Sequence, residues 1–246
     1  MIAGRRRLVV ASLVVCLGAG SVAAGVASVV GTANAQARYE DLARGTAATE
    51  AVTDAPAIDW DELEQQNSDI CAWLSVGGTS IDYPVCKRDQ SYYLTHDVWG
   101  QESSVGCPFM DELCEVDSPS VLVYAHHITG TTAMFSELSA TTTQRGFDDI
   151  LGDCRALWIT RGRTCRLRPL CTVVVDKSDQ DIQRKRFACA QNVRLWLQDQ
   201  LGRASARSAE AQTLVQGATR CVSCVTCASD ISGQRERAVV LFVDGP

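Results

Sequence analysis

The residues of this chain that could do chemistry are concentrated in its twelve cysteines and three histidines. Cys221, Cys224 and Cys227 form a C-x2-C-x2-C run, a spacing that opens iron–sulfur ligand runs and makes half of a zinc site. Asp230 stands where a fourth cysteine of an iron–sulfur run would be. The run also has the composition of a strand, on which alternate side chains face opposite ways, so Cys224 is expected to point away from the other two. This expectation argues against a metal cluster without removing it as an alternative.

A nucleophilic cysteine would need a base that is near in space, and only His96, His126 and His127 are available. His126 directly follows the apolar run Val121–Ala125 and would therefore lie at a strand end, where catalytic side chains are common. His96 is interpreted as a structural turn residue. The remaining cysteines are expected to be buried apolar side chains or halves of disulfides, whose connectivity the sequence leaves open.

The elements that must position these residues are mostly short, β-branched runs bounded by Gly, Asp or Ser, which predict strands. Helical spacing occurs between Lys185 and Leu201, and a short helix is expected within residues 60–74. Many strands with few helices indicate a mostly β domain, a barrel or a sandwich. Arg235 and Arg237 precede the last strand, where a guanidinium either stabilises an oxyanion or lies in a solvated turn. The predicted strands are Ser80–Val85, Val121–Ala125, Ala156–Thr160, Cys165–Val175, Arg220–Cys227 and Ala238–Val243.

The composition fits one main domain. A length of 246 residues with 46% hydrophobic residues supports a sizeable core and excludes wholesale disorder. The net charge of -6 argues against nucleic acid as a partner.

The amino end predicts export. Arg5, Arg6 and Arg7 precede an uncharged apolar run, Leu8–Val30, whose length of about 35 Å as a helix would cross a bilayer. The arginines place the amino terminus in the cytoplasm and the rest of the chain outside. The alternative is a secretory signal cleaved after the small-x-small triplet at residues 33–35.

Several motifs, in order, resemble those of the class B sortases, the membrane-anchored cysteine transpeptidases of Gram-positive bacteria. The similar segments are residues 79–85 (TSIDYPV), 92–97 (YYLTHD), 106–111 (GCPFMD), 124–127 (YAHH), 134–138 (MFSEL) and 223–227 (SCVTC), with Arg237 leading into the last strand. The chain departs from the family at Ala125, where a glycine is usual, and at His127, where an asparagine is usual. His126 keeps the family's offset from Tyr124.

The resemblance implies a site and a reaction. Cys227 would be the nucleophile, His126 the general acid and base, and Arg237 the group that stabilises the oxyanion. Thr226 and Arg237 would bind substrate, Cys221 and Cys224 would be packing residues, and Arg235 would be solvated. The enzyme would cleave a carboxyl-terminal sorting motif of exported proteins through a thioacyl intermediate and transfer the acyl group to an amine of peptidoglycan or of a pilin subunit. No cofactor or metal is implied.

The resemblance also implies an organisation and a location. The fold would be a sortase-type closed β-barrel with a few peripheral helices, preceded by a transmembrane helix. Residues 1–30 would form the basic segment and anchor, 31–57 a partly helical spacer and 58–246 the catalytic domain, on the outer face of the cell membrane. Two other functions stay open: a membrane-tethered, non-catalytic β domain that binds cell-wall peptides, and a plain cysteine protease.

Overall fold

The computed structural model describes residues 31–48, 57–89, 92–179, 181–184, 186–229 and 235–244. The predicted anchor, Leu8–Val30, lies outside these residues and stays a prediction. Within the described ranges, no helix is both long and apolar enough to cross a membrane. The chain divides into two compact units, Met1–Tyr39 and Glu40–Pro246. Residues 31–46 are helical, and the second unit contains the sheets.

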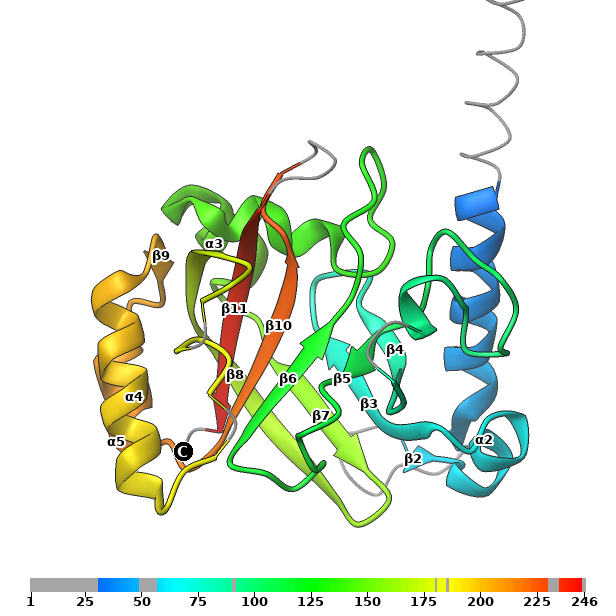
Figure 1. Cartoon of the computed structure of the whole chain (residues 1–246), viewed down its shortest axis with the longest axis horizontal. Helices are drawn as coiled ribbons and strands as arrows, with labels where there is room; N and C mark the ends of the chain where they lie inside the picture. The colour runs from blue at the N-terminus through cyan, green and yellow to red at the C-terminus, as the bar shows by residue number, and fades with distance from the viewer. Residues whose placement is uncertain are drawn as a thin grey trace, which may run out of the picture. The chain divides into compact units, whose positions relative to one another are not determined.

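The second unit is built on a closed β-barrel (Figure 1). Nine strands are hydrogen-bonded in the order β11-β10-β6-β5-β4-β3-β7-β8-β9, and a further pairing of β11 with β8 closes the ring. β9 is an extension on β8, so eight strands form the barrel. The predicted mostly β, closed-barrel fold is confirmed. The strands are β3 Ile70–Val76, β4 Asp82–Cys86, β5 Phe109–Met110, β6 Ser120–Tyr124, β7 Ala156–Thr160, β8 Arg163–Asp176, β9 Ala206–Arg207, β10 Cys221–Cys227 and β11 Glu236–Asp244, with a separate pair β1 Ala47–Ala48 and β2 Ala57–Ile58.

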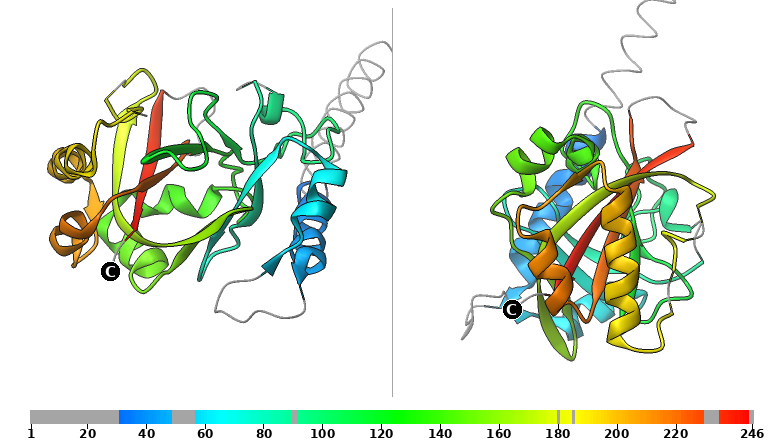
Figure 2. Two further views of the ribbon diagram at one scale, coloured as in Figure 1. Left: turned by 90° about the horizontal axis from the view of Figure 1, so that it is seen from below. Right: turned by 90° about the vertical axis from the view of Figure 1, so that its left-hand side faces the viewer.

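Short helices surround the barrel. They are α2 Trp60–Gln66, η1 Tyr92–Leu94, η2 Ser136–Thr142, α3 Gln144–Leu151, α4 Ala190–Arg203 and α5 Ala211–Gly217. Helices α4 and α5 lie side by side against one face of the barrel, as the two views of Figure 2 show. The predicted helical segment within 185–201 is therefore confirmed as α4.

The predicted helix within residues 60–74 is only partly right. Asp59 caps α2 by accepting hydrogen bonds from the backbone of Asp61 and Glu62, but α2 ends at Gln66. Trp73 and Leu74 belong instead to β3, where ladders to β4 and β7 bury them almost completely. Tertiary pairing on both edges overrides the local helical spacing here.

The core explains the composition of β10 and β11. Alternate residues of these strands, including Cys221, Val225 and Val239, pack against α4 and α5, while Cys224 and its neighbours on the other face are also fully buried. From α4, Val193 and Leu197 enter this core. Burial of each such side chain contributes about 1.5–3 kcal/mol to the stability of the fold. This packing holds α4 and α5 against the two strands that carry the candidate site.

Candidate active site

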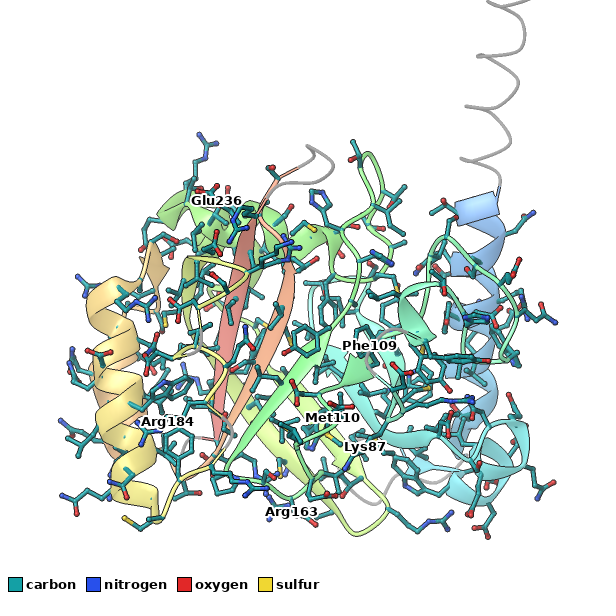
Figure 3. The ribbon with its side chains drawn as sticks, in the orientation of Figure 1. Lys87, Phe109, Met110, Arg163, Arg184 and Glu236 are labelled. Carbon is teal, nitrogen blue, oxygen red and sulfur yellow. The ribbon has the colours of Figure 1, made fainter. Side chains whose placement is uncertain are left out.

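Strand register places Cys227 directly opposite Arg237. The last residue of β10 pairs with the second residue of β11 in an antiparallel ladder. Directly opposed residues of such a ladder have Cβ atoms about 4.5–5.5 Å apart and share one face of the sheet. The thiol and the guanidinium stem are therefore neighbours. They lie at the end of the barrel where Figure 3 labels Glu236.

A second register brings His126 to the same place. β6 runs parallel to β10, with Tyr124 paired to Val225, so a residue two positions further along lies level with Cys227. The chain stays against β10 over this step because the Ala125 amide donates to the Val225 carbonyl at 3.2 Å and the Thr226 hydroxyl donates to the Ala125 carbonyl at 3.0 Å.

The four predicted site residues line one cavity of about 660 Å³. Cys227 and His126 are half-buried, while Thr226 is buried. The stacked rings of Phe109 and Tyr124, with centroids 5.4 Å apart, form part of the apolar wall; Figure 3 labels Phe109 on β5. The other lining residues are Leu94, Leu122, Ala125, Val175, Asp176, Lys177, Ile182, Gln183, Val225 and Val239.

His126 is oriented by the backbone of η1. Its Nε2 lies 2.7 Å from the Leu94 carbonyl oxygen. A carbonyl oxygen can only accept a hydrogen bond, so Nε2 must carry a proton. Nδ1 is therefore the ring nitrogen that can take up or release a proton. Gly106 packs beside this contact with φ 68°. A Cβ there would lie 2.5 Å from the Tyr93 carbonyl oxygen and 3.2 Å from Cδ2 of His126.

The other two histidines are placed differently. Neither is among the residues that line the cavity. His127 forms a β-bridge with Met134. The His96 ring stacks on Tyr92 at a centroid distance of 4.1 Å, and its Nδ1 lies 3.0 Å from the Tyr92 carbonyl oxygen, which is a structural role.

The other two cysteines of β10 differ from Cys227 because they are completely buried. Burial raises the pKa of the Cys221 thiol to about 12 and also raises the pKa of Cys224, so both stay protonated near neutrality. β10 turns Cys224 to the opposite face from Cys221 and Cys227, and the described part of the chain has no group of three or more His, Cys, Asp or Glu that could hold a metal ion. Three converging thiolates are therefore not formed by this run.

Arg235 is exposed, as predicted, but it is also fixed. Its guanidinium donates to both oxygens of Asp176, at 2.7 and 2.9 Å, and these hydrogen bonds lower the pKa of the Asp176 carboxyl. The pair joins the residue just before β11 to the last residue of β8, and Arg235 is two positions before Arg237. Arg237 donates from Nη1 to the Glu236 carbonyl at 3.0 Å.

Sequence reasoning did not find Leu94 or the wall formed by Asp176, Lys177, Ile182 and Gln183. A backbone carbonyl carries no sequence signal, and the wall comes from the connection between β8 and α4, which has no motif. The pairing of β11 with β8 brings the wall to the cavity, and the connection between β4 and β5 brings Leu94 there.

Two curated proteins are similar to part of the chain. Sortase B of Listeria monocytogenes is 30% identical over 80 residues, which are 31% of this chain and 32% of that protein. Sortase B of Staphylococcus aureus is 35% identical over 83 residues, 32% of this chain and 33% of that protein. The chain thus spans about a third of the length of each curated relative. No family model matches the sequence.

Solved structures extend the likeness to the whole barrel. The Staphylococcus aureus sortase B–substrate complex superposes with a TM-score of 0.68 at 23% identity, covering 85% of this chain and 94% of that chain. A sortase B complexed with triglycine gives a TM-score of 0.63 at 22% identity, over 75% of this chain and 84% of that one. The barrel therefore has the sortase fold.

Proposed function

Because this chain is a homologue of the class B sortases in sequence and has their fold, we propose that it is a cysteine transpeptidase with Cys227, His126 and Arg237 as its catalytic residues. The observation that carries the proposal is the pairing of β10 with a different strand on each of its two edges. Its antiparallel ladder sets Cys227 opposite Arg237, and its parallel ladder to β6 brings His126 level with Cys227. All three residues line one cavity.

The first half-reaction forms a thioester. The Cys227 thiolate attacks a peptide carbonyl carbon, and the carbonyl π electrons move to oxygen, beside the Arg237 guanidinium. A positioned donor of this kind contributes about 10²–10³ in rate. As the tetrahedral intermediate collapses, the C–N bond breaks and His126 Nδ1 gives its proton to the departing amine. The acyl group is left on sulfur.

The second half-reaction reverses these roles. An acceptor amine attacks the thioester carbonyl, and the neutral imidazole takes its proton at Nδ1. The C–S bond then breaks and the Cys227 thiolate is released. During both steps, Nε2 donates to the Leu94 carbonyl, which keeps the ring in one orientation and one tautomer.

The substrate we propose is a sorting motif near the carboxyl end of an exported protein, and the acceptor is an amine of peptidoglycan or a pilin lysine. The substrate complex and the triglycine complex of the sortase B neighbours support this choice. We propose that residues 1–30 anchor the enzyme in the cell membrane with the amino terminus inside, that 31–57 are a spacer, and that 58–246 act outside. Thr226 binds substrate through its place in the cavity wall.

The direct test is to trap the intermediate. The purified chain is incubated with a library of sorting-motif peptides, and intact-protein mass spectrometry should detect an acyl adduct that maps to Cys227. Cys227→Ala should lose the adduct and His126→Ala should lose turnover, while His127→Ala should keep both. Loss of activity in His127→Ala with His126→Ala still active would overturn the assignment.

The acceptor distinguishes this proposal from its rivals. With triglycine or a lysine derivative present, a transpeptidase converts the peptide to an amide product, whereas a protease yields the free acid at any amine concentration. A non-catalytic binding domain would bind cell-wall peptides without forming an adduct.

A further inference from the structure

We propose that Cys86 and Cys107 form a disulfide in the exported protein. Their sulfur atoms are 3.7 Å apart, and both side chains are almost completely buried, with exposed fractions of 0% and 2%. This pair plays no part in the catalytic proposal, and no sequence motif marks it. The two sulfurs need to approach by only about 1.6 Å to reach a disulfide bond length.

The backbone around the two residues is already held together. Cys86 ends β4, and its amide donates to the Pro108 carbonyl at 3.0 Å. The Cys107 amide donates to the Tyr93 carbonyl at 3.0 Å. Hydrogen bonds therefore hold the end of β4 beside the start of β5, and they hold Cys107 beside η1.

The bond would close a loop that includes the support of His126. Residues 86 and 107 are 21 positions apart, and between them lie Leu94, whose carbonyl accepts from His126, and Gly106, which packs against the His126 ring. A crosslink at the base of this loop restricts the unfolded chain and holds η1 against β5. It thereby stabilises the position of His126. This consequence rests on the proposed catalytic role of His126, whereas the disulfide itself rests only on the proposed export of the chain.

The oxidation must take place before the pair is buried. Burial and the neighbouring Cys107 raise the pKa of the Cys86 thiol, so in the folded protein the reactive thiolate is scarce. During folding outside the membrane, a thiolate of the pair attacks the disulfide of a thiol–disulfide oxidoreductase or of oxidised glutathione, and a mixed disulfide forms. The second thiolate then displaces the carrier. Two thiols lose two electrons and two protons, and the acceptor disulfide is reduced to two thiols.

Other described cysteines offer useful comparisons. Cys221 and Cys224 are near in sequence but face opposite sides of β10. Cys114 is buried, and its thiol lies 3.6 Å from the Ser120 carbonyl oxygen. Cys114→Ala is therefore a matched control for the removal of a buried thiol from the same part of the barrel.

The first experiment maps the bond. The full chain carrying Cys227→Ala is refolded with oxidised and reduced glutathione, denatured without reductant and alkylated. It is then reduced and labelled with a second reagent. We expect the second label on Cys86 and Cys107 and the first label on Cys114. The first label on both Cys86 and Cys107 would overturn the proposal.

The second experiment measures its effect. In the same background, reduction should lower the Tm by about 6–12 °C. Cys86→Ala and Cys107→Ala should each abolish this reduction-dependent shift, and Cys114→Ala should retain it. A shift that persists in either single variant would assign the bond to another pair. Since Cys227 is absent throughout, neither outcome depends on transpeptidase activity.

Discussion

Cys227 and Arg237 lie directly opposite each other at the ends of β10 and β11. The ladder continues from them through six further pairs of residues into the core that α4 and α5 cover. The proposed nucleophile and the proposed oxyanion donor therefore lie at one end of a two-strand frame, and the proposed base, His126, follows a third strand, β6.

Replacement of Arg237 should affect the chemical step. We expect Arg237→Ala to lower kcat for peptide cleavage by about 10²–10³, because one oxyanion donor is lost, and Arg237→Lys to recover only part of the rate, because lysine cannot reproduce the planar fork. Steady-state kinetics of both variants test this. Arg166→Ala, at an exposed position of β8, is the control and should be unchanged. Equal kinetics for Arg237→Ala and the wild type would contradict the role.

Gly106 should be required for the position of His126. In Gly106→Ala the new Cβ would meet the Tyr93 carbonyl oxygen at 2.5 Å and the His126 ring at 3.2 Å. Displacement of a catalytic group by about 1 Å can cost about 10² in rate, and we expect a loss of this size in kcat.

Gly130→Ala is the matched control for this variant. Gly130 has a similar φ of 74°, but no atom lies within 4 Å of its added Cβ. Both variants therefore carry the same backbone strain, and only Gly106→Ala adds the contact. A comparable loss of kcat in both would show that strain, and not the position of His126, is responsible.

The ion pair of Asp176 and Arg235 should make stability depend on acid pH. The hydrogen bonds from Arg235 lower the pKa of Asp176 in the folded protein, so the pair contributes stability above the unfolded pKa of about 3.9. That contribution is lost as the pH falls further toward the folded pKa. Thermal denaturation scans should therefore show that the Tm of the wild type falls by more between pH 5 and pH 2 than the Tm of Asp176→Asn.

Asp199→Asn, at an exposed position of α4, should show the wild-type acid profile. Identical profiles for Asp176→Asn and wild type would show that the pair does not contribute to acid stability.

Buried thiols should make the barrel sensitive to alkali. Burial raises the pKa of Cys221 to about 12, while an unfolded cysteine has a pKa of about 8.5. Between these values the unfolded state binds fewer protons, so stability falls as the pH rises. We expect Cys221→Ala to show a shallower fall than wild type in urea denaturation from pH 8.5 to 11. Cys189→Ala, at an exposed position, should keep the wild-type slope.

Local sequence patterns and the ordered motifs were enough to predict the class of fold and the candidate site residues. Short, β-branched apolar runs located β4, β6, β7, β8, β10 and β11, because such runs bury one or both faces of a strand wherever it is placed. The ordered motifs singled out Cys227, and the offset from Tyr124 selected His126 over His127. Local patterns could not assign β3, whose helical spacing is overridden by pairing with β4 and β7.

Tertiary structure alone decided which residues meet. Cys227 is 101 positions from His126, so their approach depends on the parallel register of β6 and β10. The Leu94 carbonyl and the wall after β8 have no side-chain signature, and the contact of Cys86 with Cys107 depends on how the segment before β5 folds onto β4. Apolar runs and motifs are local properties of a sequence. The closed barrel is instead a set of pairings between residues far apart in the chain, and these pairings determine the geometry of the site.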